Sequence, residues 1–123
     1  MTHRTFGEFF KACRIKAGVT LRAFSQNHGF DPGNISRLER GRLAPPHSQE
    51  KLARYAEALG LAPDSDDWVE FHDLAAAQTG RIPRDILSDE EVVTKLPAVF
   101  RTLRTQKVDS DQLDELVERI RRT

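Results

Sequence analysis

The chain has 123 residues, of which 31% are charged and 38% hydrophobic, with one cysteine and a formal net charge of zero at pH 7. A single cysteine, Cys13, excludes an internal disulfide and favours a reducing compartment. No apolar run reaches the ~20 residues that span a bilayer, and the N-terminus has no signal-peptide pattern, so we expect a cytoplasmic protein. No segment alternates like a strand, and the sequence therefore predicts an all-α fold.

The zero net charge results from two halves of opposite charge. Residues 1–62 carry ten Lys and Arg against five Asp and Glu, whereas residues 63–123 carry nine against fourteen. A basic half is the electrostatic feature expected of a nucleic-acid-binding domain, and an acidic half is repelled by phosphates. We therefore expect a DNA-binding domain at residues 1–62 and a separate helical C-terminal region at residues 63–123.

Capping residues predict the first three helices in chain order. Side chains suited to an N-cap stand at Thr5, Thr20 and Asp31, and glycines suited to end the first two helices stand at Gly18 and Gly29. The second and third helices are therefore short and joined by a tight turn.

The third helix, from Pro32 to about Arg40, combines an apolar face with a polar one. Ile35 and Leu38 are three residues apart, on one face that can press against Phe24 of the second helix. The outward positions carry small, amide, hydroxyl and guanidinium groups: Gly33, Asn34, Ser36, Arg37 and Arg40. Such groups bind base edges and phosphates, so residues 21–41 predict a DNA-reading helix-turn-helix.

Residues 6–61 resemble the phage-repressor-type helix-turn-helix family, which includes Cro, lambda repressor and the xenobiotic-response-element regulators. The resemblance rests on FGEFFKACRIKAGVTL, RAFSQNHG, DPGNISRLERGR and KLARYAEALGL, and the run ISRLERG is its most specific part. It implies a five-helix lambda-repressor-like DNA-binding domain followed by a small helical C-terminal region. It also implies a bacterial or phage-type repressor that acts at the nucleoid and binds a palindromic operator in double-stranded DNA as a homodimer.

The same resemblance assigns roles to individual residues. It implies that bases are read by Gly33, Asn34, Ser36 and Arg37, and that phosphates are contacted by Thr20, Arg22, Arg40, Arg42 and His47. It further implies a structural ion pair between Arg14 and Glu39, which would tie the first helix to the third. Pro32 and Gly33 depart from the family, because relatives often carry base-reading glutamines there, so readout should fall mainly on Asn34 and Arg37.

Three further helices are expected before the last one. Ser48 begins a fourth helix with one apolar face, and Ser65 or Asp66 caps a fifth that runs to about Thr79. After an irregular stretch, a capping box that starts at Ser88 opens another helix, which we expect to break before Pro97.

The last helix has the clearest periodicity of the second half. Its apolar residues recur at i, i+3, i+4 and i+7, and form a possible dimer interface: Leu113, Leu116, Val117 and Ile120. One recognition helix contacts too few bases, which favours a dimer, although these residues could instead complete an intramolecular core.

Two alternatives involve a protein partner. The patterns at Gly80–Pro83, Leu96–Pro97 and Phe100–Arg104 resemble the tail of bacterial repressor-like proteins that a metallopeptidase inactivates. The chain could equally be an antitoxin-like module whose acidic half binds a toxin. A ligand-sensing regulator is a third possibility.

No chemistry-bearing motif stands out. His3, His28, His47 and His72 are scattered without metal-ligand spacing, and no phosphate-binding loop, nucleophile elbow or Cys–His pair is present. We therefore expect no metal, no cofactor, no catalytic residue and no enzymatic activity.

Overall fold

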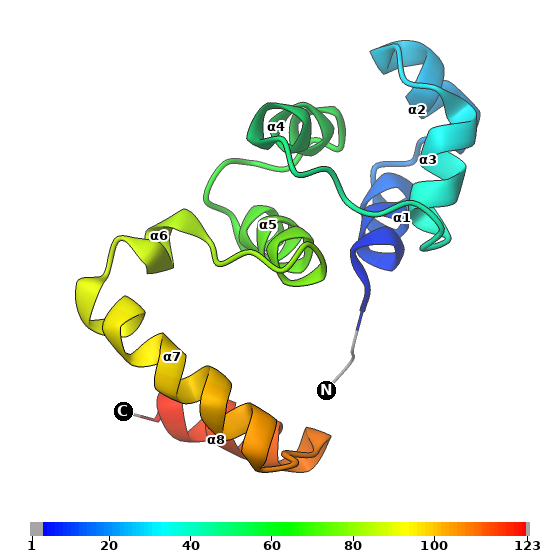
Figure 1. Ribbon diagram of the computed structural model, residues 1–123. Helices are drawn as coiled ribbons and strands as arrows, with labels where there is room; N and C mark the ends of the chain where they lie inside the picture. The colour runs from blue at the N-terminus through cyan, green and yellow to red at the C-terminus, as the bar shows by residue number, and fades with distance from the viewer. Residues whose placement is uncertain (1–3, 123) are drawn as a thin grey trace. The chain divides into compact units, whose positions relative to one another are not determined.

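The computed structural model describes residues 4–122, and helices are the regular secondary structure within them (Figure 1). The all-α fold class is therefore confirmed. The helices are α1 (Phe6–Lys16), α2 (Leu21–His28), α3 (Pro32–Glu39), α4 (Gln49–Ala58), α5 (Asp66–Gln78), α6 (Arg84–Leu87), α7 (Glu90–Thr105) and α8 (Ser110–Arg121). None of these helices is both long enough and apolar enough to cross a membrane.

The predicted N-caps of the first three helices are confirmed. The side chains of Thr5, Thr20 and Asp31 each accept a hydrogen bond of 3.1 Å from the backbone N–H three residues further on. Gly29 ends α2 in the left-handed conformation, with φ of 70°, which only glycine adopts without steric cost. Local chemistry thus fixes the tight turn between α2 and α3.

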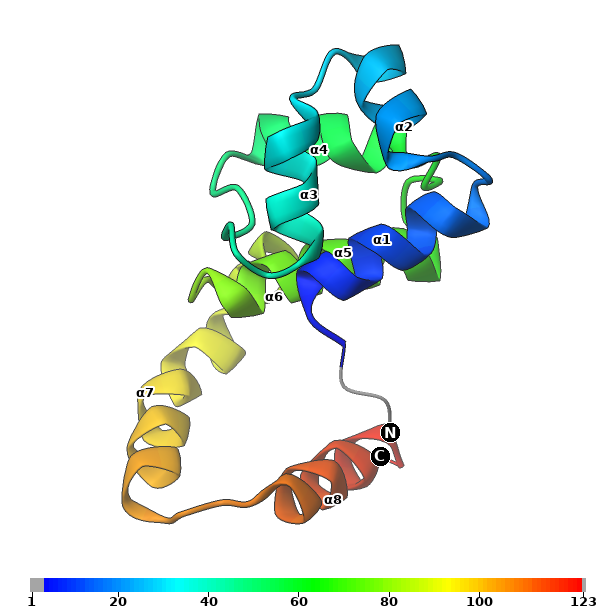
Figure 2. The ribbon, with the colours of Figure 1, turned by 90° about the vertical axis from the view of Figure 1, so that its right-hand side faces the viewer.

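The chain divides into two compact units, the first ending at Pro83 and the second beginning at Arg84. In the first unit, α1 packs against α3 and α5, α2 packs against α3, and α4 packs against α5. Figures 1 and 2 show α2 and α3 together on the side of this unit away from α5. The pair that should read DNA is therefore carried at one side of a five-helix domain.

The first unit extends beyond the boundary expected at residue 62, because α5 contributes to its core. Phe71 on α5 is fully buried, and its ring centroid lies 4.9 Å from that of Phe6. Phe10 contacts Phe24 and Tyr55 edge-on at 5.6 and 5.4 Å. Apolar contacts of this kind, rather than the change in charge, set the boundary between the units.

The helix break expected before Pro97 is wrong. α7 runs without interruption from Glu90 to Thr105, with Pro97 inside it. A proline removes one backbone hydrogen bond and crowds the preceding turn. The helical turns on both sides keep their remaining hydrogen bonds, which is enough to carry the helix through.

The cap of α7 also differs from the expected one. Asp89, not Ser88, is the N-cap, and its carboxylate accepts from the N–H groups of Glu91 and Val92 at 3.1 and 3.2 Å. The Ser88 hydroxyl instead donates to the carbonyl of Asp85 at 2.7 Å, at the end of α6. The segment before Ser88, which was expected to be irregular, thus contains one helical turn, α6, and the Ser88 hydroxyl bonds to a carbonyl of that turn.

Candidate nucleic-acid interface

One face of α3 is held by the core and the opposite face is open. Ile35 and Leu38 are buried, as is Phe24 on α2, while Asn34 and Arg37 are exposed. Figure 2 shows α3 at the surface of the first unit beside α2. The helix can therefore present its polar side chains outward without losing its packing.

The base-reading candidates form one contiguous group. The Arg37 guanidinium donates through Nη2 to Oδ1 of Asn34. It also lies over Gly33, where an added Cβ would stand 3.5 Å from Arg37 Nη1. Ser36 is half-buried beside them. The structure thus brings the amide and guanidinium groups together over a glycine.

The phosphate-contacting candidates occupy three segments next to the two helices. Thr20 and Arg22 stand at the start of α2, and the hydroxyl of Thr20 is already an acceptor for its cap. Arg40 and Arg42 follow the end of α3, and His47 lies in the connection to α4. All five side chains are exposed. Within residues 4–122 the three arginines form no ion pair with a described carboxylate, so their charge is available to a ligand.

Arg14 and Glu39 meet in a buried ion pair. Arg14 Nε lies 2.8 Å from Glu39 Oε2 and Nη2 lies 3.0 Å from Oε1, with the two side chains 9% and 4% exposed. Arg14 Nη1 also donates to the carbonyl of Val19 at 2.8 Å. The hydrogen bond to Glu39 raises the pKa of Arg14. This two-pronged contact joins α1, the segment before α2 and the end of α3.

Gly7 is a positioning residue that the sequence analysis did not identify. A Cβ added at Gly7 on α1 would lie 2.2 Å from the backbone oxygen of Leu38 and 2.9 Å from that of Glu39. Only glycine therefore lets α1 approach the end of α3 this closely. The available signal was a glycine inside the first turn of a helix, where glycine is otherwise unfavourable.

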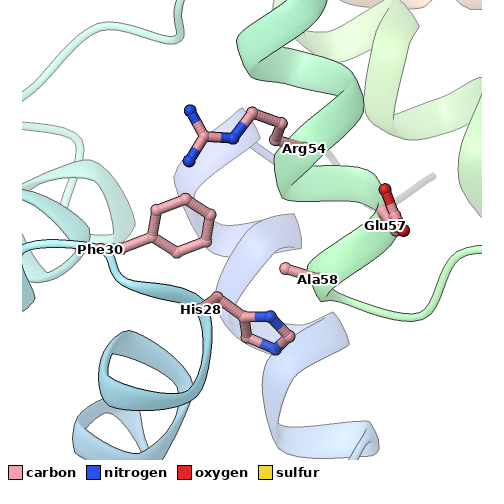
Figure 3. Close-up of a pocket in the computed structure, with 5 residues that line it drawn as sticks. All are labelled: His28, Phe30, Arg54, Glu57 and Ala58. Carbon is pink, nitrogen blue, oxygen red and sulfur yellow. The ribbon is translucent and has the colours of Figure 1, made fainter.

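A shallow hollow of about 320 Å³ lies behind the turn between α2 and α3 (Figure 3). Arg54 and Glu57 border it from α4, and the Arg54 guanidinium carbon is 5.7 Å from the ring centroid of Phe30. His28 is exposed, and its ring lies 5.2 Å from that of Phe24. The contact between Arg54 and Phe30 supports the turn from the side of α4.

The candidate dimer residues belong to α8, in the second unit. Their exposed fractions are 42% for Leu113, 49% for Leu116, 38% for Val117 and 65% for Ile120. Within residues 4–122 no group of three or more His, Cys, Asp or Glu is arranged to hold a metal ion. His3 lies outside the described residues.

Residues 5–68, just over half of the chain, match the helix-turn-helix domain family. The chain belongs to the helix-turn-helix domain family. Neither a curated protein nor a solved structure gives a significant match. The helix-turn-helix domain covers α1 to α4 and the start of α5, and supports a DNA-binding regulator of transcription.

Proposed function

We propose that this helix-turn-helix protein is a sequence-specific repressor that binds a palindromic operator as a homodimer and catalyses no reaction. The observation that carries the proposal is the exposed pair Asn34 and Arg37 on the open face of α3. An amide and a guanidinium there can each bond two atoms of a purine edge, adenine for asparagine and guanine for arginine.

The two kinds of contact divide the work of binding. Exposed arginines at both ends of the α2–α3 pair, among them Arg22 and Arg42, bind phosphates and fix the register. Arg37 and Asn34 then exchange their mutual hydrogen bond for bonds to bases. The buried pair of Arg14 and Glu39 holds α3 at a fixed angle during this exchange.

The homodimer follows from the small reach of one helix. A single α3 contacts too few base pairs for a genomic site, whereas two copies related by a two-fold axis read half-sites about 34 Å apart. The second unit supplies exposed apolar side chains on α7 and α8 that a second copy can cover.

The decisive experiment is selection of duplexes from a random DNA library at near-physiological salt, followed by sequencing. We expect an inverted repeat with half-sites about ten base pairs apart. The double variant Asn34→Ala/Arg37→Ala, which keeps the buried face of α3, is the matched control and should lose the enrichment. Salt-sensitive binding of the wild-type chain without any enriched sequence would contradict sequence-specific regulation.

The repressor role has its own test. The selected operator is placed across a promoter in a purified transcription reaction, and the chain is added. We expect transcription to fall in parallel with operator occupancy. A rise in transcription would identify an activator instead.

A second role is capture of another protein by the acidic half of the chain, residues 63–123. The exposed apolar side chains of the second unit favour it as well. It covers the antitoxin-like and the metallopeptidase-controlled alternatives. Sedimentation of the purified chain distinguishes this role from the homodimer, because a partner-binding module sediments as a monomer when it is purified alone. Purified peptidase that leaves the chain intact and bound to DNA would exclude the peptidase alternative.

A further inference from the structure

α8 presents an apolar stripe to solvent. Leu113, Leu116, Val117 and Ile120 follow the spacing of one helical face, and each is between 38% and 65% exposed. Apolar side chains of α7 are exposed to a similar degree, since Val99, Phe100 and Leu103 are 44–46% exposed. Within the described part of the second unit no side chain is buried. A stripe this regular is the pattern of a helix that packs against another helix.

The charges of α8 change sign along its length. Acids prevail in its first half, with Asp111, Asp114 and Glu115, and bases at its end, with Arg119, Arg121 and Arg122 around a single acid, Glu118. Within the helix, Arg119 pairs with Glu115 at 3.8 Å and Arg121 with Glu118 at 3.1 Å. Acids near the N-terminus and bases near the C-terminus suit the helix dipole. The same order makes the parallel and the antiparallel pairing of two α8 helices differ in electrostatic energy. Two such helices bring like charges together when parallel and opposite charges together when antiparallel.

We infer that α8 pairs antiparallel with α8 of a second copy of the chain, about a two-fold axis that passes between Leu116 and Val117. This pairing rests on the homodimer of the proposed function. It adds the contact surface, the relative direction of the two helices and the residues that lie opposite one another. Leu113 of one copy then lies opposite Ile120 of the other, and the whole apolar stripe is covered. Asp114, on the flank of the stripe, comes near Arg121 of the second copy, which also pairs with Glu118 of its own helix.

A second copy fits this surface because the stripe is complementary to itself. The apolar residues are placed symmetrically about the middle of α8, and the acidic end matches the basic end in reversed direction. This is the property of an isologous interface, in which the same patch serves both subunits. α7 of the same chain is the competing occupant, because it too begins with acids, Glu90 and Glu91, and ends with bases, Arg101 and Arg104.

Disulfide cross-linking of variants that each add one exposed cysteine to the full chain tests the direction. In the antiparallel register the two copies of residue 113 lie about 10 Å apart along the helices, from the 1.5 Å rise per residue. That separation is too large for a disulfide, which needs Cα atoms within about 7 Å. Residue 113 faces residue 120, and residue 116 lies close to its own copy.

We therefore expect no cross-linked dimer from Leu113→Cys alone or from Ile120→Cys alone, and an efficient cross-link when the two are mixed. Leu116→Cys should cross-link to itself and serves as the positive control. The wild-type chain is the negative control, because its Cys13 is buried. The melting of the first unit, measured for each variant, shows that the chain remains folded.

The outcomes separate this inference from the proposed function. Cross-linking of Leu113→Cys to itself would establish parallel pairing and overturn the register while leaving the homodimer. A dimer by sedimentation with no cross-link at any of the three positions would place the interface elsewhere. A monomer by sedimentation, without cross-links, would overturn both the register and the homodimer, and would leave α7 of the same chain or a different protein to cover the stripe. Sequence-specific DNA binding is tested separately by the duplex selection.

Discussion

At the scale of single residues, the contact between Arg37 and Asn34 places the two base-reading candidates on one exposed patch. We predict that Arg37→Ala weakens binding to the selected operator by about 1–3 kcal/mol, because a bidentate contact to a base is lost. It should also relax the preference at one base pair. Fluorescence anisotropy with the operator and with single-base variants measures both effects, and an unchanged preference would remove Arg37 from base reading.

Arg42 gives the matched comparison, since it is an exposed arginine beyond the end of α3. We predict that Arg42→Ala weakens binding to all sequences alike and lowers the slope of log affinity against log salt by about one charge. A titration series at several salt concentrations measures this slope. An effect confined to one base would contradict the phosphate role.

Substitutions at two glycines of the first unit distinguish a role in helix packing from a position on the DNA-facing surface. Gly7→Ala should destabilise the fold by about 1–3 kcal/mol, because its Cβ would meet the backbone oxygen of Leu38 at 2.2 Å. Gly33→Ala is the matched control, since its Cβ would meet only side-chain atoms, at 3.3 Å or more. We expect it to preserve stability in urea unfolding. Equal loss from both substitutions would contradict the close approach of α1 to α3.

At the scale of helices, the ion pair of Arg14 and Glu39 joins α1 to the end of α3. We predict that Glu39→Leu alone costs about 3–5 kcal/mol, because it leaves a buried arginine without a counter-charge. The double variant Arg14→Met/Glu39→Leu should cost less than this single one, since no charge stays buried. Urea unfolding of the two single variants and the double variant measures the coupling, and additive losses would contradict it.

The position of His72 on α5 makes the stability of the first unit depend on pH. Its ring lies 4.3 Å from that of Trp68, its Nε2 is buried without a hydrogen-bond partner among the described residues, and burial lowers its pKa below the ordinary 6.5. Asp73 opposes this shift in part. The unfolded chain therefore binds a proton near pH 6.5 that the folded chain binds only at lower pH.

We predict that the free energy of unfolding decreases as the pH falls from 6.5 towards the lowered pKa of His72. His72→Phe should reduce this decrease, because the variant has no group there to titrate. His47→Gln, which changes an exposed histidine, is the control and should leave the dependence intact. A wild-type profile that matches that of His72→Phe would contradict the assignment.

At the scale of the whole molecule, the buried core lies between Phe6 and Ala75 within the described residues 4–122. We predict that a chain ending at Pro83 unfolds with the same midpoint as the first unit of the full chain. It should be monomeric and bind the operator more weakly, with a smaller salt dependence, because fewer phosphates are contacted. Sedimentation and anisotropy measure these properties, and a truncated chain that dimerises would place the interface in the first unit.

Much of the first unit could be predicted because its signals are local. N-caps at Thr5, Thr20 and Asp31 and the left-handed Gly29 depend on side chains and backbone within a few residues. The outward face of α3 follows from helical periodicity once its buried residues are known. The helix break predicted at Pro97 was wrong, because the local preference of proline for the start of a helix was outweighed by the helical turns on both sides of it.

The sequence by itself determined the class of fold, the starts of most helices and the residues that α3 turns outward, because capping and periodicity act over short distances along the chain. Only the tertiary structure decided that α5 belongs to the first unit, that Gly7 must lack a side chain and that Arg37 contacts Asn34. These features depend on how closely helices approach one another. That distance is set by packing between residues remote in sequence, which no local pattern encodes.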